Sequence, residues 1–348
     1  MRRITKAIAV GNIYVGGDHP ITVQSMTTTD PRNTEESIMQ IHRLEEAGCD
    51  IVRVAVPTME SALSLGRLKE ATSIPLVADI HFDYRIALEA IKQGVDALRL
   101  NPGNIGEKAR VIEVVKAAKE RRIPIRIGVN AGSLEKPLLE KYGFPTAEAM
   151  VESAFGHISI LEEMNFTDIV VSLKASDVAM TVEAYRMMSE RCDYPLHLGI
   201  TEAGTVWAGT IKSSVGIGAL LLQGIGDTIR VSLTGDPVEE IRVGRQILKS
   251  LGIIQNEITI VSCPTCGRCQ IDLINLAKEV EDKIGTLKKP IKLAIMGCAV
   301  NGPGEAREAD IGIAGGVDSA LLFKKGVIVG KIPEDKIVET LIQEIEKL

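Results

Sequence analysis

The sequence predicts an α/β protein in which an N-terminal (β/α)8 TIM barrel, residues 1–252, is followed by a smaller α+β domain, residues 257–348. Short apolar stretches alternate eight times with stretches of helical period over about 230 residues, which is the count and size of such a barrel. After Leu251 the pattern changes to shorter strands and two helices. The rival fold is a doubly wound sheet that binds a dinucleotide, but no G-x-G-x-x-G motif opens a helix after the first strand.

A short hairpin is expected first, within residues 2–17, because polar and apolar residues alternate there between the turn signals Gly11-Asn12 and Gly16-Gly17. The spacing of apolar residues then predicts helices such as those over residues 36–47, 108–121 and 238–251. Glycines at positions 48, 94 and 252 stand where helices are expected to end. Eight strands are expected to begin near Ile21, Asp50, Pro75, Ala97, Ile123, Asp168, Pro195 and Thr228.

The second domain follows a link at residues 252–256. Its strands are expected near residues 258–261, 291–296, 311–314 and 326–329. Its helices are expected near residues 271–284 and 335–347, the second of them with a clear apolar stripe. These elements describe a compact α+β module.

Composition restricts the partners of the chain. Its 348 residues carry a formal net charge of -6 and only 3% are aromatic, so neither a phosphate backbone nor stacked bases, and hence no nucleic acid, is expected as a ligand. No run of about eighteen apolar residues is present, so no membrane span is predicted. Six cysteines without a signal peptide are typical of a reducing compartment, and a cytoplasmic location is predicted.

Four of the six cysteines form a candidate metal site. Cys263, Cys266 and Cys269 are spaced C-x-x-C-x-x-C, and Cys298 lies in a glycine-rich loop about thirty residues further on. Thiolates separated by two residues can reach one metal from the same side of a tight turn. A zinc ribbon usually has a second C-x-x-C pair, whereas three clustered cysteines and a distant fourth suit a cubane iron–sulfur cluster. The pattern therefore favours a cluster over zinc.

The predicted strand ends of the barrel are unusually polar. TIM-barrel active sites are built at the carboxyl ends of the strands, and residues i and i+2 of a strand share a face. Arginines flanked by Val, Ile and Leu in central strands are expected to face the interior, since packing them against the helices would desolvate them. The polar residues at these ends are Arg53, Asp79, His81, Arg99, Asn101, Arg126, Asn130, Lys174, Glu202, Arg230 and Ser232.

Cations on five separate strands predict a site for a small polyanion, most simply a phosphate or diphosphate ester, because arginine forks match phosphate oxygens. The alternative is a set of structural ion pairs among the arginines, Asp79 and Glu202, which accounts for one or two of the cations but not for all five. The two carboxylates are also candidates for relaying a proton to a leaving oxygen.

Two motifs are especially specific: Cys-Pro-Thr-Cys-Gly-Arg at residues 263–268 and Gly-Cys-x-x-Asn-Gly-Pro-Gly-Glu at residues 297–305. Together with segments 23–26, 51–57, 78–81, 98–104, 126–130, 199–204 and 229–237, they make a set that runs in order along nearly the whole chain. This set resembles the bacterial 4-hydroxy-3-methylbut-2-enyl diphosphate synthases of the non-mevalonate isoprenoid pathway. The short interval between residues 235 and 258 corresponds to the two-domain form, without the domain that some relatives insert there.

The resemblance implies a two-electron reductive ring opening and dehydroxylation of 2-C-methyl-D-erythritol 2,4-cyclodiphosphate at a 4Fe–4S cluster. It implies Cys263, Cys266, Cys298 and Glu305 as cluster ligands, and Asp79 and Glu202 as the acid/base pair. Ferredoxin or flavodoxin as electron donor, and a head-to-tail homodimer with sites shared between the chains, are implied as well. The diphosphate is then expected on Arg53, His81, Arg99, Arg126, Lys174, Arg230 and Ser232, with Asn101 and Asn130 assisting.

Cys269 departs from the family pattern and leaves a cluster with four cysteine ligands open, although Glu305 follows Cys298 at the family's spacing. Two other functions stay open as well. The first is an electron-transfer module on an inert barrel, in which the cationic strand ends would have no function. A zinc-stabilised phosphate-binding protein is expected to be colourless, whereas an iron–sulfur protein is brown.

Overall fold

The computed structural model describes residues 2–284, 287, 289–298 and 307–348. The chain forms two compact units, Met1–Ile247 and Leu248–Leu348. Within the described ranges, no helix is both long enough and apolar enough to cross a membrane.

The first unit is a barrel of eight parallel strands, which confirms the predicted TIM barrel. Neighbouring strands pair in the order β8-β7-β6-β5-β4-β3-β10-β9, and a parallel bridge between Val171 and Leu196 joins the two ends of that order. Each strand begins close to its predicted position. The strands are β3 (Thr22–Met26), β4 (Ile51–Ala55), β5 (Leu76–Asp79), β6 (Ala97–Arg99), β7 (Ile125–Asn130), β8 (Ile169–Lys174), β9 (His197–Leu198) and β10 (Thr228–Ile229).

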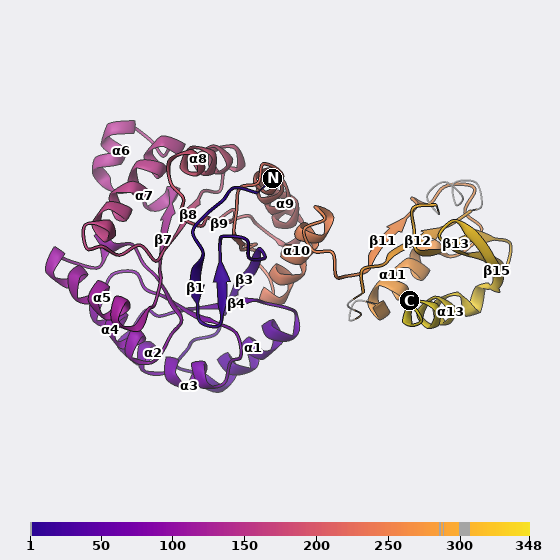
Figure 1. Ribbon diagram of the computed structural model, residues 1–348, viewed down its shortest axis with the longest axis horizontal. Helices are drawn as coiled ribbons and strands as arrows, with labels where there is room; N and C mark the ends of the chain where they lie inside the picture. The colour runs from indigo at the N-terminus through magenta and orange to yellow at the C-terminus, as the bar shows by residue number, and fades with distance from the viewer. Residues whose placement is uncertain (1, 285–286, 288, 299–306) are drawn as a thin grey trace. The chain divides into compact units, whose positions relative to one another are not determined.

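A ring of helices surrounds these strands (Figure 1). Amphipathic stripes face inward; α4, for example, buries Ile86, Ala90 and Ile91. Side-chain caps fix where several helices begin, as where the Thr146 hydroxyl accepts a hydrogen bond from the backbone N–H of Ala149. The helices are α1 (Thr34–Glu46), α2 (Met59–Leu63), α3 (Leu65–Glu70), α4 (Tyr84–Lys92), α5 (Lys108–Arg121), α6 (Lys136–Tyr142), α7 (Ala147–Glu162), α8 (Val178–Arg191), α9 (Val206–Leu222) and α10 (Pro237–Ser250), with short 3-10 turns η1 (Pro102–Asn104) and η2 (Ala131–Ser133).

The predicted hairpin closes the amino-terminal end of the barrel. β1 (Ile8–Val10) and β2 (Ile13–Val15) pair antiparallel around Gly11, whose φ of 59° is left-handed and suits a tight turn. The hairpin side chains Val10 and Val15 pack on three residues of the barrel strands, Ile51, Val77 and Ala97. Since this end is plugged with apolar side chains, the carboxyl ends of the strands form the mouth of the barrel.

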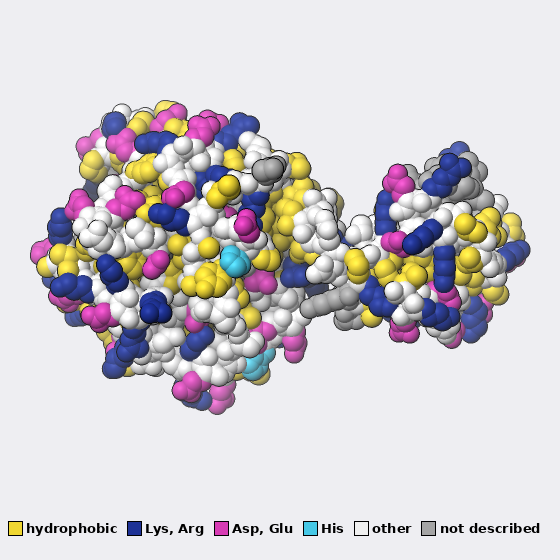
Figure 2. Space-filling view, in the orientation of Figure 1, with side chains coloured by type: hydrophobic (Ala, Val, Ile, Leu, Met, Phe, Trp, Pro, Cys, Tyr) yellow, Lys and Arg dark blue, Asp and Glu magenta, His cyan; other side chains and the backbone are white. Residues whose placement is uncertain are grey.

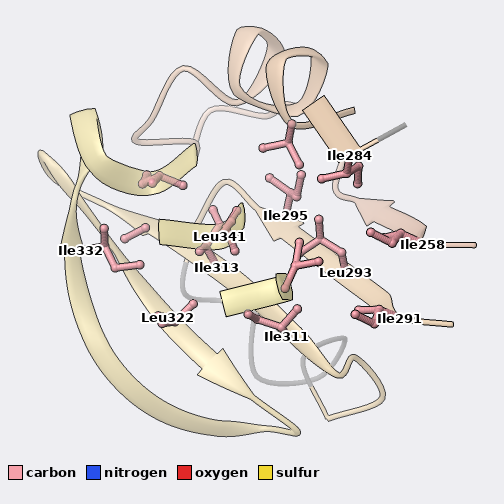
Figure 3. Packing of buried hydrophobic residues seen from close by; sticks show 14 of the residues in the cluster. Ile258, Ile284, Ile291, Leu293, Ile295, Ile311, Ile313, Leu322, Ile332 and Leu341 are labelled. Atoms are coloured by element: carbon pink, nitrogen blue, oxygen red, sulfur yellow. The ribbon is translucent and has the colours of Figure 1, made fainter. Parts of the chain in front are cut away.

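The described residues of the second unit form a five-stranded mixed sheet with two helices, α11 (Leu273–Ile284) and α13 (Ile337–Glu346), and the 3-10 turn η3 (Glu334–Lys336). β11 (Thr259–Ser262), β12 (Lys292–Met296) and β13 (Ile311–Gly316) run parallel to one another, and β14 (Ser319–Lys324) and β15 (Val327–Pro333) continue the sheet antiparallel. Figure 3 shows Ile295, Ile313 and Leu341 among the apolar side chains that pack together from the sheet and the helices.

β14 was not predicted from the sequence. Residues 320–323 are apolar at four consecutive positions, so they lack the alternation that marks a half-buried strand. The structure explains the pattern, because the strand is covered on both faces. Ala320 and Leu322 join the main core of the unit, whereas Phe323 joins a smaller apolar cluster with Ala294 and Met296.

Candidate active site

Five cations, four within barrel strands and one directly after a strand, converge inside the barrel: Arg53, Arg99, Arg126, Lys174 and Arg230. Burial, and then repulsion from neighbouring arginines, holds the pKa values of Arg126 and Lys174 well below their ordinary values. Burial also lowers the pKa of Arg53 to about 10, although Asp79 opposes that shift. On the face drawn in Figure 2, charged side chains of both signs are interspersed.

Two glycines make room for these long side chains. A Cβ atom on Gly128 would lie 2.4 Å from Nε of Arg99, and one on Gly199 would lie 3.0 Å from Nζ of Lys174. Neither glycine has a positive φ. Gly128 is therefore explained by the close approach of Arg99 to the strand backbone, whereas a Cβ atom on Gly199 would first meet the backbone carbonyl oxygen of Arg230, 2.6 Å away, and then Lys174.

Asp79, at the end of β5, is the carboxylate between two of the arginines. Its oxygens lie 3.2 Å from Nη1 of Arg99 and 3.6 Å from Nε of Arg53, and the side chain is buried. Burial alone would raise the pKa of Asp79, but Arg53, His81 and Arg99 together hold it well below its usual range. Asp79 is therefore ionised at neutral pH and has no proton to donate there.

Arg230 pairs with Glu240, in the first turn of α10, and not with Glu202. Nε and Nη2 of Arg230 each lie 3.3 Å from an oxygen of this buried carboxylate. Glu240 was not among the predicted site residues, because an acidic pair after Asp-Pro is ordinarily read as the solvated start of a helix. The structural ion pairs considered as an alternative thus exist for Arg53, Arg99 and Arg230, but their carboxylates are Asp79 and Glu240.

Arg126 is turned toward the plugged end of the barrel. Its Nη1 donates to the side-chain oxygen of Gln24, and the residue lines a small cavity together with Val10 and Val15 of the hairpin. Nη2 is buried and has no hydrogen-bond partner in the part of the chain that the structure describes. Gln24 is a second residue that sequence reasoning missed, since an amide inside a barrel strand carries no distinctive signal.

The interior charge is far from balanced. Among the described residues, the five cations face two carboxylates, those of Asp79 and Glu240, which leaves a surplus of three positive charges. Lys174 has no ion-pair partner within these ranges. Such a surplus, buried where water cannot screen it, is an electrostatic trap for a small polyanion.

Asn101 is bonded to the backbone of the neighbouring strand. Its amide nitrogen donates to the carbonyl of Gly128 at 3.0 Å, and its amide oxygen accepts the N–H of the same residue at 2.8 Å. The side chain therefore joins the end of β6 to β7 beyond the last paired residues of those strands. In this arrangement Asn101 holds the backbone over which Arg99 lies, and these two bonds use one of the two N–H groups of its amide.

Four other predicted residues line the mouth. His81 is about half exposed and lies 3.7 Å from Asp79 and 3.4 Å from Nη1 of Arg99. Glu202 is exposed and has a φ of 51°, a left-handed conformation that costs energy for a residue with a Cβ and that recurs at functional sites. Asn130 and Ser232 are partly buried at their strand ends, and neither side chain makes a hydrogen bond to the described residues.

The cysteines follow the carboxyl ends of two neighbouring parallel strands in the second unit. Cys263 follows β11 and Cys298 follows β12, and these strands pair in parallel with Ser262 opposite Ile295, so both loops leave the sheet at the same edge. Cys266 is exposed, and the backbone N–H of Arg268, assisted by its charge, lowers the pKa of the Cys266 thiol. Glu305 lies outside the described residues.

The donor set suits an iron–sulfur cluster, although among the described residues no three Cys, His, Asp or Glu side chains are gathered closely enough to hold a metal ion. The N–H of Gly297 donates to Sγ of Cys263 at 3.2 Å, the kind of bond that stabilises a ligating sulfur. Cys269 instead directs its thiol at the carbonyl of Ile271, 3.3 Å away, and packs against Gly297.

Both units match sequence models of known families. One model, described as GcpE TIM-barrel domain, matches residues 5–245, and another, described as GcpE protein C-terminal domain, matches residues 259–347. A protein of Ruminiclostridium cellulolyticum named 4-hydroxy-3-methylbut-2-en-1-yl diphosphate synthase (flavodoxin) is 63% identical over 347 residues, which cover 100% of this chain and 98% of that one. Relatives of the same name from Clostridium perfringens and Geobacter sulfurreducens are 60% and 61% identical, and the matches cover 100% of this chain and 99% of each relative.

Solved structures of lower identity share the barrel. Dihydropteroate synthase from Yersinia pestis is 12% identical, with a TM-score of 0.52, and the match covers 71% of this chain and 98% of that one. The enzyme of the same name from Stenotrophomonas maltophilia has a TM-score of 0.53 at 12% identity, covering 71% of this chain and 97% of that one. At such identities the likeness concerns the fold alone.

Proposed function

The chain belongs to the GcpE family of enzymes, and on that premise we propose that it converts 2-C-methyl-D-erythritol 2,4-cyclodiphosphate to 4-hydroxy-3-methylbut-2-enyl diphosphate by two-electron reductive ring opening and dehydroxylation. The relatives' names give 4-hydroxy-3-methylbut-2-en-1-yl diphosphate as the product and add flavodoxin, which suits the role of electron donor in this reduction. We assign the same donor to this chain.

The observation that carries the proposal is the surplus of three positive charges inside the barrel. A diphosphate brings two or three negative charges, about enough to neutralise that surplus, and its oxygens match the arginine forks. An electron-transfer module would have no use for such an interior. In the proposed complex the diphosphate lies against Arg53, Arg99, Lys174 and Arg230, with His81, Asn101, Asn130 and Ser232 at its edges, and Arg126, which is turned toward Gln24, adds its charge from the plugged side of the barrel.

Glu202 is the proposed proton donor to the leaving oxygen. It stands at the mouth in a strained backbone conformation, whereas Asp79 is held ionised between two arginines. Asp79 is therefore limited to accepting a proton or to stabilising positive charge during the reaction. The two carboxylates thus have different tasks in the proposed acid/base pair.

A 4Fe–4S cluster, held by Cys263, Cys266, Cys298 and Glu305, would supply the electrons. The chain's own contribution at that site is the N–H of Gly297 directed at Cys263, together with the exposed thiol of Cys266 for the incoming iron. Cys269 stays outside the ligand set in this proposal, because its thiol is engaged with a backbone carbonyl.

We also assign the chain a head-to-tail homodimer in which the active sites are shared. The structural feature in favour of self-association is an exposed apolar stripe on α9, made of Trp207, Ile211, Val215 and Leu222. Stripes of this kind on outer helices are typical of interaction surfaces. Sedimentation at twice the 37.5 kDa of one chain is the expected result, and sedimentation as a monomer would contradict the assignment.

The test of the activity is anaerobic turnover of the cyclodiphosphate by the iron-loaded protein with reduced flavodoxin, followed by phosphorus NMR of the product. Open-chain diphosphate is expected in proportion to the electrons supplied. A protein with full iron and sulfide content that binds no cyclodiphosphate would favour an electron-transfer module. A colourless protein that carries zinc would favour the zinc-stabilised phosphate-binding alternative.

A further inference from the structure

We infer that Glu240 is a positioning residue that orients Arg230 for the anionic substrate. The inference rests on the function proposed above, and it concerns a residue outside the predicted ligand set. Glu240 belongs to α10, on the outside of the barrel wall, yet its carboxylate is 4% exposed and reaches the strand ends.

The carboxylate of Glu240 is fully engaged by donors from three segments. Oε2 accepts from the hydroxyl of Ser25 at 2.7 Å and from Nε of Arg230 at 3.3 Å. Oε1 accepts from Nη2 of Arg230 at 3.3 Å and from the backbone N–H of Leu233 at 3.1 Å. One buried group thus joins β3, the end of β10 and the loop that leads into α10. Its four hydrogen bonds satisfy the carboxylate without water.

The contact determines which edge of the Arg230 guanidinium is available. Glu240 takes the edge formed by Nε and Nη2, whereas Nη1 makes no hydrogen bond to the residues that the structure describes. An arginine fork held along one edge loses little further freedom when its other nitrogen meets a phosphate oxygen. Without the carboxylate, repulsion from the other cations would drive the guanidinium away from them.

Charge alone does not account for a glutamate at this position. A negative charge 3.3 Å from Arg230 weakens the attraction of the barrel for an anion, so a site selected only for positive potential would be better without it. A positioning role therefore predicts the opposite change in anion affinity from the one that a purely electrostatic role predicts. If Glu240 acts by orientation, its removal weakens anion binding; if it acts only by charge, its removal strengthens anion binding.

The variant Glu240→Gln distinguishes these two changes in anion affinity. A glutamine amide has one acceptor, so its nitrogen must face a donor, Nε of Arg230 or the hydroxyl of Ser25, and the two-point contact with the guanidinium is lost. We expect the dissociation constant of inorganic pyrophosphate, measured by calorimetry, to rise about ten- to a hundredfold, the factor that corresponds to one lost charge-assisted hydrogen bond. The KM for the cyclodiphosphate is expected to rise by a similar factor.

The matched control is Glu239→Gln on the same turn of α10. Glu239 pairs with Arg242 at the surface and contacts none of the barrel cations, so pyrophosphate binding is expected to be unchanged. Glu240→Asp supplies a second test, because it keeps the charge and withdraws the carboxylate by about one bond length, roughly 1.5 Å. Positioning predicts weaker binding in this variant also, and it decides the question if Glu240→Gln does not fold.

A double-mutant cycle with Arg230→Ala tests whether Glu240 acts through that arginine. If it does, Glu240→Gln changes pyrophosphate affinity little once Arg230 is absent, whereas a general effect on barrel stability would add to the loss. Equal or tighter binding by Glu240→Gln and Glu240→Asp would overturn the inference and leave the proposed function intact. Failure of the wild-type protein to bind either pyrophosphate or the cyclodiphosphate would instead refute the proposed function itself.

Discussion

Replacement of Asp79 by Asn is expected to lower the free energy of unfolding of the barrel by about 3–5 kcal/mol, the usual cost of removing one partner from a buried ion pair. The carboxylate is 5% exposed and lies 3.2 Å from Arg99 and 3.6 Å from Arg53. At an effective dielectric constant of about 20, each contact contributes roughly 5 kcal/mol of gross attraction. Desolvation of the carboxylate offsets several kcal/mol of this, but after the substitution both arginines keep their own desolvation penalty.

The same substitution is expected to raise the affinity of the barrel for an anion and the stability that the bound anion adds. With Asp79 neutralised, the interior surplus rises by one positive charge, so pyrophosphate should bind more tightly and restore more stability than it adds to the wild type. A ligand present at about a hundred times its dissociation constant adds roughly 2.7 kcal/mol of stability. The variant is therefore expected to be the less stable protein without pyrophosphate and the more strongly stabilised one with it.

The contribution of Asp79 to the stability of the barrel is expected to decrease in acid. The pKa of Asp79 is depressed in the folded protein, so its stabilising contribution is complete above the unfolded pKa of about 4 and is lost as the pH falls through the folded pKa. The difference between wild type and Asp79→Asn should therefore be constant near neutral pH and shrink in acid below about pH 4.

Calorimetric and circular-dichroism unfolding, with and without pyrophosphate, measure all three effects. Glu152→Gln is the control, since it removes a carboxylate from an exposed contact with Lys141 at 2.6 Å and should change stability far less. If Asp79→Asn and Glu152→Gln lower the free energy of unfolding equally at neutral pH, the buried ion pairs of Asp79 make no net contribution to stability. The repulsion among the interior cations is then weaker than their number indicates.

Four further outcomes are expected. Gly128→Ala should place a Cβ 2.4 Å from the guanidinium that crosses it, which lowers stability by about 1–3 kcal/mol and weakens pyrophosphate binding; unchanged binding would contradict this geometry. Because burial holds the pKa of Lys174 well below its ordinary value, an anion that favours the charged amine should bind with uptake of protons in the pH range where the amine titrates, seen as a buffer-dependent calorimetric enthalpy that Lys174→Met abolishes. Glu202→Gln should keep pyrophosphate affinity and lose most turnover, and wild-type turnover would remove it as the proton donor. In anaerobic Mössbauer spectra, Cys269→Ala should leave all irons unchanged whereas Glu305→Ala alters one; the reverse result would mean a cluster with four thiolate ligands.

The fold could be predicted because its signals are local and repeated. Each strand is a short apolar run, and several helices end at a glycine such as Gly48 or Gly94, with φ of 87° and 86°. β14 is also a short apolar run, but only two residues separate it from β13, so no helical stretch lies between the two strands as it does between the strands of the barrel. The alternation of strand and helix thus located the barrel strands, and it gave no signal where one strand follows another directly.

The candidate site could be predicted only in part, for a physical reason. A period of two and the cost of burying charge indicate which side chains face the interior, and that placed five cations there. They do not indicate which side chains meet, since that depends on the register of strands far apart in the sequence. Arg126 with Gln24, 102 positions apart, and Ser25 with Glu240, 215 positions apart, are contacts of this kind. The two bonds that Asn101 makes to Gly128 are contacts of this kind as well.

The distribution of the two interior carboxylates indicates what the barrel is built to bind. Full neutralisation would have stabilised the unliganded protein, since each unpaired buried cation keeps an uncompensated desolvation penalty. Instead, Asp79 and Glu240 pair with three arginines, and Lys174 and Arg126 have no carboxylate partner among the described residues. The repulsion that remains among the barrel cations is relieved when an anion binds, and only an anion with two or three negative charges relieves it fully. A monoanion would leave part of the surplus in place, so the arrangement selects a diphosphate over a monoanionic ester by charge before any shape of the substrate is involved.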